Sequence, residues 1–248
     1  MIYFSICTRK DKQPKSLNNL INWINKDNSI DYSLSYDSKS IYEGHKYNID
    51  QFKSFKGGLT DDDIIVLCHD DLDVLSTQDQ VKEYLQIARQ PKTGFVGLCG
   101  ASHYNIDGAW WNARNSGEAR GFCFQGNDIQ TMKPNYFGRS GQVIILDGIF
   151  LAITYKKLKE IGMDQPKYLS SGWDFYDVHI TFTSHQLGYN NYTVPILAMH
   201  ESDGRMREGW FKAKEEFMMF HKREVPCKIP YQLTHGLPVE TGENTWSI

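Results

Sequence analysis

Short runs of β-branched and aromatic residues alternate with helix-like segments through the first hundred positions of the chain. The runs that predict strands cover residues 2–7, 32–36, 64–68 and 95–99. Between them, apolar side chains recur at helical spacing, first from Leu17 to Ile24 after Pro14 and again from Thr77 to Arg89. This alternation indicates a βαβ-wound sheet with parallel strands. The continuous apolar run 64–68 predicts a central strand whose carboxyl end is a natural ligand edge.

The pattern changes between residues 101 and 141, where Gly, Asn, Ser and aromatic residues replace regular periodicity. A segment of this length without predicted structure is usually functional or mobile. Further along, the pattern predicts a β-rich run over 143–154 interrupted at Asp147-Gly148, a helix over 173–187, a strand over 192–199 and a helix over 208–223. After Pro226 we expect a tail, either irregular and wrapped on the domain or disordered.

Composition narrows the classes of partner. At 248 residues the chain is long enough for one sizeable core, so we expect one domain. With 27 basic and 30 acidic residues, the net charge of -3 argues against nucleic acid and anionic membrane surfaces as partners.

No apolar run approaches the roughly 20 residues of a membrane span, and the N-terminus lacks the basic segment of an export signal. We therefore expect a cytoplasmic protein. The five cysteines are widely spaced without a Cys-x-x-Cys pair, which predicts neither a zinc knuckle nor a disulfide framework.

The first candidate for chemistry is the sequence His69-Asp70-Asp71-Leu72-Asp73, which directly follows the buried strand 64–68. Hard divalent ions such as Mg²⁺ and Mn²⁺ choose carboxylate oxygens and share them with phosphate oxygens. An acidic cluster at this sheet edge can therefore hold a metal and a diphosphate. A solvated acidic turn is the alternative, and the motif alone favours neither.

The second candidate is the segment from Ser171 to Asp177. Ser171 followed three residues later by Asp174 resembles a capping box that opens a helix, which would place Asp174 and Asp177 on one face. A carboxylate at Asp177 would then be placed to accept a proton from a sugar hydroxyl. In the alternative interpretation, both acids only complement the helix N-terminus. His179 falls on the apolar side of this helix and is predicted to be structural.

The third candidate is His200, which ends a late predicted strand. A lone histidine at a strand end is usually structural, but one at the ligand edge of a sheet can complete a metal site. Arg205 and Arg207 follow it, either as a flap that covers a diphosphate or as ordinary surface charges.

In this order along the chain, these segments resemble the glycosyltransferase family-2-like proteins with the GT-A fold, in particular the branch with a His-x-Asp metal motif. The matching segments are Ile65-Val-Leu-Cys-His69-Asp-Asp71, Leu146-Asp-Gly-Ile-Phe-Leu-Ala152, Phe175-Tyr-Asp177-Val-His179, Gly188-Tyr189 and His200-Glu-Ser202. The resemblance implies a single GT-A-like α/β domain over residues 1–225, built on a mostly parallel mixed central sheet flanked by helices. Residues 1–100 would form the nucleotide-binding half and 101–225 the acceptor-binding half, followed by the tail 226–248.

The resemblance also implies roles for individual residues. Asp177 would be the catalytic base, and Asp71 would bind Mn²⁺ (or Mg²⁺) with His69 and His200 as further ligands. The expected donor-binding residues are Thr8, Arg9, Asp37, Asn48, Asp70, Asp73 and Arg205. The expected acceptor-binding residues are Trp110, Trp111, Asp147, Gly148, Trp173 and Asp174.

The implied reaction transfers a sugar from a nucleotide-diphosphate sugar, with a UDP-sugar as the first expectation, to a carbohydrate or glycoconjugate acceptor. An Asp general base would activate the acceptor, and the configuration of the anomeric carbon would be inverted. Two features depart from the family pattern: His179 replaces an acid, and Asp73 offers a competing Asp71-x-Asp73 metal motif. The alternatives are a noncatalytic sugar- or nucleotide-binding relative and a metal-dependent phosphohydrolase.

Overall fold

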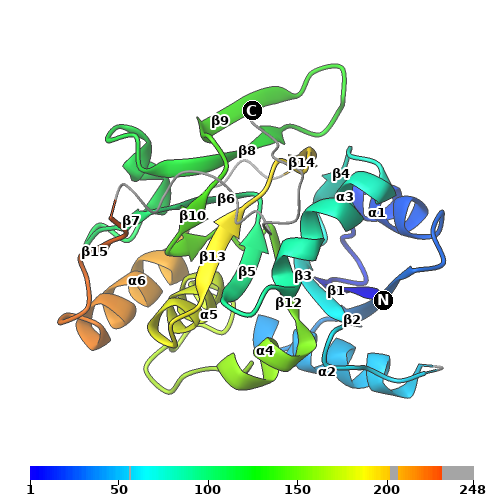
Figure 1. Ribbon diagram of the computed structural model, residues 1–248, viewed down its shortest axis with the longest axis horizontal. Helices are drawn as coiled ribbons and strands as arrows, with labels where there is room; N and C mark the ends of the chain where they lie inside the picture. Colours follow the sequence, from blue (N-terminus) through cyan, green and yellow to red (C-terminus); the bar gives the residue numbers. More distant parts are fainter. Residues whose placement is uncertain (56, 202–205, 231–248) are drawn as a thin grey trace.

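A sheet of seven strands forms the centre of the protein (Figure 1). The structure is a computed structural model that describes residues 1–55, 57–201 and 206–230. The strand order is β10 (Gln142–Val143), β13 (Asn190–Thr193), β5 (Thr93–Gly97), β12 (Phe150–Thr154), β3 (Ile64–His69), β1 (Ile2–Thr8) and β2 (Ile30–Tyr36). β1 is parallel to β2 and β3, and β13 is parallel to β5, whereas β12 runs antiparallel between β3 and β5 and β10 is antiparallel to β13. The predicted mixed, mostly parallel sheet is therefore confirmed.

Helices cover both faces of this sheet. Alternate residues of β1 point to opposite faces, and the apolar side chains on each face pack beneath helices. Phe4 and Ile6 join the core beneath α1 (Lys15–Ile24) and α3 (Gln78–Leu85), whereas Tyr3 joins the core beneath α2 (Ile41–Ser54) and α4 (Tyr155–Ile161). The predicted start signals hold for α1 and α3, since Pro14 precedes α1 and Thr77 forms a capping box on α3. The 3-10 turn η1 (Gln86–Arg89) continues α3. The result is a three-layer α/β arrangement.

A second sheet stands beside the first and contains much of the region expected to be structureless. Its strands are β11 (Ile145–Leu146), β6 (Cys99–Ala101), β8 (Ala119–Gln125), β14 (Ala198–His200) and β4 (Leu72–Val74), with β9 (Lys133–Gly138) on β8. The expectation for residues 101–141 was therefore wrong. Its strands are irregular: at Gly121 (φ 96°), an added Cβ would lie 1.8 Å from the carbonyl oxygen of Leu98, so the close strand pairing there requires glycine.

The predicted strand over residues 192–199 is divided between the two sheets. β13 ends at Thr193 and pairs in the main sheet, whereas β14 begins at Ala198 and pairs with β4 and β8. Pro195 lies between them and has no N–H group to donate to a ladder, which explains the interruption. This division sends His200 to the second sheet, next to the turn that follows β3.

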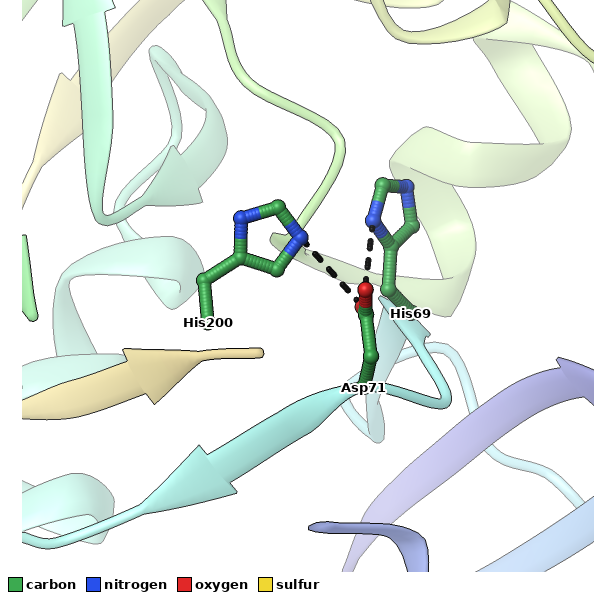
Figure 2. Close-up of side chains that lie close together, drawn as sticks. All are labelled: His69, Asp71 and His200. Atoms are coloured by element: carbon green, nitrogen blue, oxygen red, sulfur yellow. Dashed lines mark ion pairs between the residues drawn. The ribbon is translucent and has the colours of Figure 1, made fainter. Parts of the chain in front are cut away.

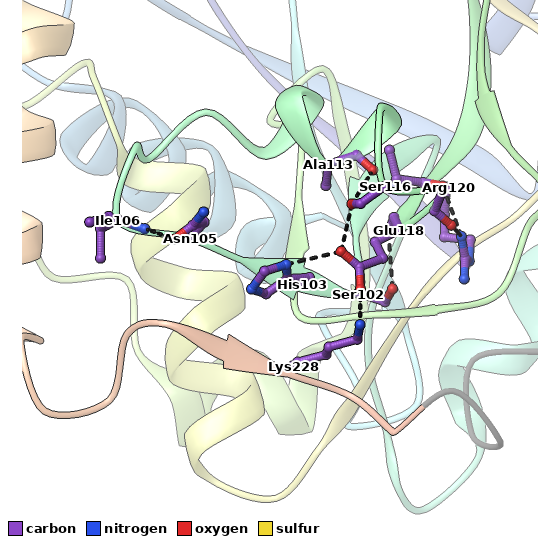
Figure 3. A network of polar contacts seen from close by, with 11 residues as sticks. Ser102, His103, Asn105, Ile106, Ala113, Ser116, Glu118, Arg120 and Lys228 are labelled. Carbon is purple, nitrogen blue, oxygen red and sulfur yellow. Dashed lines mark hydrogen bonds and ion pairs between the residues drawn. The ribbon is translucent and has the colours of Figure 1, made fainter.

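The end of the described chain is fastened to the second half of the domain. After α5 (Tyr176–Gln186) and α6 (Glu208–Phe220), the short strand β15 (Cys227–Lys228) pairs with β7 (His103–Tyr104). Glu118 accepts hydrogen bonds from His103 Nδ1 at 3.0 Å and Ser116 Oγ at 2.6 Å, and it forms an ion pair with Lys228 (Figure 3). The start of the expected tail is thus wrapped on the domain, while 231–248 lie outside the described residues. Among the helices of the described ranges, none has both the length and the apolar character of a membrane span.

Candidate metal centre and active site

His69, Asp71 and His200 meet where β3, β4 and β14 come together (Figure 2). His69 is the last residue of β3, Asp71 lies in the turn before β4, and His200 ends β14. β14 pairs with β4 so that His200 stands opposite Leu72, and the Glu201 N–H donates to the Asp71 carbonyl at 2.9 Å. Strand pairing therefore brings together two segments that are far apart in the sequence.

The three side chains converge on a common point. His200 Nε2 lies 3.3 Å from Asp71 Oδ1, and His69 Nδ1 lies 3.7 Å from the same oxygen. One ligand atom from each residue lies within 4.8 Å of the others, and the described part of the chain contains no second group of this kind. The structure thus brings together the three residues that the sequence predicts as metal ligands.

The chemistry of this cluster fits a divalent cation. Asp71 Oδ1 and His200 Nε2 are both buried and have no hydrogen-bond partner among the described residues, and buried polar atoms rarely remain unsatisfied. Burial alone would raise the pKa of Asp71, but the imidazoles of His200 and His69 lower it to about 2, so the carboxylate is ionised at neutral pH. A site of two imidazoles and one carboxylate suits Mn²⁺ better than Mg²⁺, which prefers oxygen ligands.

Glu201 holds the end of β14 in place, a role that the sequence did not predict. Its Oε2 atom accepts hydrogen bonds from the Ser16 N–H at 3.3 Å and the Ser16 hydroxyl at 2.7 Å, in the first turn of α1. A carboxylate is favourable there because the helix N-terminus carries unpaired N–H groups and a partial positive charge. The sequence showed Glu201 only as the neighbour of His200, without a sign of its partner.

Four of the expected donor-binding residues lie at the carboxyl ends of β1, β2 and β3. Thr8 Oγ1 donates to Asp70 Oδ2 at 2.6 Å, and the Asp37 N–H donates to the Thr8 carbonyl at 3.0 Å. Burial raises the pKa of Asp70. Arg9 follows Thr8 and is exposed at this edge. Arg205 lies outside the described residues.

Two other expected donor-binding residues lie elsewhere. Asn48 lies on the buried face of α2, where its amide nitrogen donates to Ser5 Oγ at 3.1 Å and the Ile6 carbonyl at 3.0 Å. Its amide therefore fastens α2 to β1 instead of facing the nucleotide edge. Asp73 accepts a hydrogen bond from Asn19 at 2.7 Å, against α1 and away from the cluster. The competing Asp71-x-Asp73 arrangement is therefore not formed in this structure.

The segment before α5 differs from the predicted capping box. α5 begins at Tyr176, and Phe175 before it has a left-handed backbone with φ of 62°. Ser171 Oγ does donate a hydrogen bond to Asp174 Oδ2 at 2.7 Å, but this bond lies in a turn that precedes the helix. Because Phe175 is not helical, Asp174 and Asp177 do not share a helix face. Residues in this backbone region are strained, and such strain is concentrated at functional sites.

Asp177 is held in a defined orientation by backbone N–H groups. Its Oδ2 accepts from Gly148 at 2.9 Å and its Oδ1 accepts from Val178 at 2.9 Å. Burial and the nearby charge of Asp147 raise the pKa of Asp177 to about 7. Asp147 in turn accepts from the Ile149 N–H at 3.0 Å. A carboxylate with a pKa near neutrality can accept a proton efficiently at physiological pH.

The expected acceptor-binding tryptophans differ in exposure. Trp110, in the 3-10 turn η2 (Trp110–Arg114), is 4% exposed and packs against Phe137 with ring centroids 4.8 Å apart. It is a core residue, which corrects the expectation that it lines a pocket. Trp111 is partly buried beside Trp210 at 5.7 Å. Trp173 is 46% exposed and is the tryptophan of the three that offers an open aromatic face.

His179 has the structural surroundings that the sequence predicts. Its Nδ1 lies 2.8 Å from the Tyr168 hydroxyl, and burial lowers its pKa to about 4. The neutral imidazole therefore belongs to the packing between α5 and the loop before it, outside the metal cluster.

A family match and one solved structure agree with this architecture. Residues 54–232 match the family described as "Glycosyltransferase like family". A search of curated proteins gave no significant match. Among solved structures, GalNAc-T7 with UDP, GalNAc and Mn²⁺ is 9% identical with a TM-score of 0.54, and the match covers 90% of this chain and 48% of that one. A197 from STIV is 16% identical with a TM-score of 0.45 over 83% of this chain and 88% of that one. The family match covers well over half of the sequence, so this chain belongs to the glycosyltransferase-like family, with the GT-A fold.

Proposed function

We propose that the protein transfers a sugar from a nucleotide-diphosphate sugar to a carbohydrate or glycoconjugate acceptor in a Mn²⁺-dependent reaction. The observation that carries this proposal is the cluster of His69, Asp71 and His200 beside the strand ends that hold Thr8 and Asp70. The related fold of GalNAc-T7, whose structure contains UDP, GalNAc and Mn²⁺, supports a UDP-sugar as the donor. Residues 1–100 supply most of this edge and are proposed as the nucleotide-binding half.

The cluster would bind the donor through its diphosphate. His69, Asp71 and His200 would hold the ion, and the ion when bound neutralises negative charge on the diphosphate as it leaves. Asp71 is suited to this task because a carboxylate ionised at neutral pH is a ligand that divalent cations choose. Thr8 lies at the end of β1 and donates a hydrogen bond to Asp70, and both residues would lie near the nucleotide.

Asp177 would act as the general base on the acceptor side. As the acceptor hydroxyl oxygen bonds to the anomeric carbon of the sugar, its proton passes to Asp177. The bond from that carbon to the diphosphate oxygen breaks, and the nucleoside diphosphate leaves with the electron pair. Attack opposite the leaving group inverts the anomeric carbon. Trp173, with its exposed ring, is proposed to contact the acceptor together with Asp147, Gly148 and Asp174.

A ligand screen tests the proposal. The protein is mixed with a panel of nucleotide sugars and either Mn²⁺, Mg²⁺ or a chelator, and thermal stability is measured, because a ligand that binds only the native state stabilises it. We expect a UDP-sugar to raise the melting temperature with Mn²⁺ and not with the chelator, and to be consumed once a suitable glycan acceptor is present. Binding without turnover over a broad acceptor panel would indicate a noncatalytic relative. Turnover of simple phosphoesters without a sugar donor would indicate a phosphohydrolase.

A further inference from the structure

The hydroxyl of Tyr176 lies between the metal cluster and the loop that contacts Asp177. It is 2.9 Å from the Gly148 carbonyl oxygen and 3.1 Å from His69 Nε2. The ring is 3% exposed and stands at the first position of α5. Tyr176 therefore contacts one expected metal ligand directly, although the sequence assigns this tyrosine no role.

The hydrogen count of this contact determines which tautomer a neutral His69 imidazole adopts. A tyrosine hydroxyl has one hydrogen to donate, and a carbonyl oxygen has none. The Tyr176 hydrogen must therefore go to Gly148, the partner that can only accept. The contact with His69 then requires that Nε2 carries the hydrogen and donates it to the tyrosine oxygen. This leaves the lone pair on Nδ1, the nitrogen that faces Asp71 at 3.7 Å.

The opposite arrangement is disfavoured by the same distances. If Tyr176 donated to His69 Nε2, the Gly148 carbonyl would lose this donor, and the hydrogen of His69 would sit on Nδ1. His69 Nδ1 lies 3.7 Å from Asp71 Oδ1, so a hydrogen on Nδ1 would be too far from the carboxylate for a normal hydrogen bond. It would also occupy the nitrogen that points into the cluster.

The backbone at Gly148 keeps this arrangement close. A Cβ added at Gly148 would lie 2.3 Å from the Tyr176 hydroxyl oxygen and 3.1 Å from Cβ of Asp177. The same glycine donates its N–H to Asp177 Oδ2 at 2.9 Å. Gly148 therefore contacts both Tyr176, the neighbour of the expected metal ligand His69, and the proposed base Asp177. A larger residue at position 148 would displace both side chains.

We propose that Tyr176 is a positioning residue that holds His69 in the Nε2–H tautomer, with the Nδ1 lone pair directed at the metal. This inference rests on the metal site of the proposed function. Metal-binding histidines commonly donate their second ring N–H to a fixed acceptor, which sets the tautomer and the ring orientation. Here the acceptor is a tyrosine oxygen, itself fixed by its bond to a backbone carbonyl.

Nuclear magnetic resonance of the metal-free protein tests the tautomer directly. Protein with ¹⁵N-labelled histidine is studied at alkaline pH, where imidazoles are neutral, and the His69 nitrogens are assigned with a His69→Gln variant. We expect the hydrogen of His69 on Nε2 in the native protein and a mixture of tautomers in Tyr176→Phe. A hydrogen on Nδ1 in the native protein, or an unchanged tautomer in Tyr176→Phe, would overturn the proposal.

Calorimetric titration with Mn²⁺ provides a second readout. Tyr176→Phe should weaken Mn²⁺ binding by about 10- to 100-fold, the usual effect of removing a partner of a metal ligand. Tyr42→Phe is the matched control, because Tyr42 is a buried neighbour of Tyr176, with ring centroids 6.5 Å apart, and its hydroxyl has no partner among the described residues. It should bind Mn²⁺ like the native protein, and equal affinity of all three proteins would contradict the proposal. If the native protein binds no Mn²⁺, the metal site fails, while the tautomer measurement still decides the role of Tyr176.

Discussion

His200 Nε2 lies 3.3 Å from Asp71 Oδ1, and both atoms are buried without a hydrogen bond in the described structure. The pairing of β14 with β4 brings His200 close to Asp71, because it sets His200 opposite Leu72. Two such atoms without other partners are costly to bury, unless a cation or a proton joins them. This relationship is the structural basis for the proposed metal centre.

Replacing the proposed base should stop transfer without preventing donor binding. Asp177→Asn keeps the shape of the side chain but cannot accept the acceptor proton, so we expect turnover to fall by about a hundredfold to ten-thousandfold. Donor affinity, measured by calorimetry with Mn²⁺, should stay close to that of the native protein. Near-normal turnover by the folded variant would exclude Asp177 from the mechanism.

The same residue should make stability depend on pH. Burial and Asp147 raise the pKa of Asp177 from 3.8 to about 7 in the folded protein. Between these values the unfolded chain releases a proton that the folded protein retains, so this group lowers the free energy of unfolding as pH rises from about 4 to about 7. Urea unfolding across this range should show a smaller decrease for Asp177→Asn than for the native protein. Parallel pH profiles for the two proteins would show that the pKa of Asp177 is not raised.

Two tryptophans should respond differently to truncation. Trp110 is 4% exposed and Trp173 is 46% exposed. Trp110→Ala should lower the free energy of unfolding by about 3–5 kcal/mol, as expected for a buried aromatic side chain. Trp173→Ala should cost less than about 1 kcal/mol while raising the acceptor concentration needed for half-maximal rate. Denaturant unfolding and acceptor titrations measure both effects, and a reversed order of stabilities would contradict the assigned burial.

The contacts of Glu118 should stabilise the protein at neutral pH and not in strong acid. Burial alone would raise the pKa of Glu118, but Lys228, Ser116 and His103 lower it from 4.5 to about 2. The stabilisation is therefore complete above about pH 4.5 and is lost as pH falls toward about 2. Glu118→Gln should be less stable than the native protein at pH 7, with the difference shrinking in acid. A difference that stays constant with pH would show that the charge of Glu118 does not stabilise the fold.

The regular elements of the first half could be predicted from sequence because their signals are local. Apolar periodicity after Pro14 and the capping residue Thr77 indicated α1 and α3, and continuous apolar runs indicated the central strands. The start of α5 was misplaced because the left-handed backbone of Phe175 depends on tertiary packing. The Phe175 ring contacts Trp210 and Phe217, with centroids 5.3 Å and 5.8 Å away, and no local pattern encodes those contacts.

The three residues of the metal cluster could be identified from the sequence, but the contacts around them could not. His69, Asp71 and His200 were identified from their positions at strand ends and from the family resemblance. The hydrogen bonds of Glu201, Tyr176 and the buried Asn48 depend on which strands pair and on side-chain direction. Sequence spacing carries little information on such contacts, because their partners come from distant segments of the chain.

The most direct test of the metal centre is a calorimetric Mn²⁺ titration of donor binding for the native protein, His200→Ala, Asp71→Asn and Asp73→Asn. Asp73 is the matched control, since it comes two positions after Asp71 but accepts a hydrogen bond from Asn19 away from the cluster. We predict that His200→Ala and Asp71→Asn require far more Mn²⁺ for donor binding, whereas Asp73→Asn keeps the native requirement. An unchanged Mn²⁺ requirement in His200→Ala and Asp71→Asn would contradict the proposed metal centre.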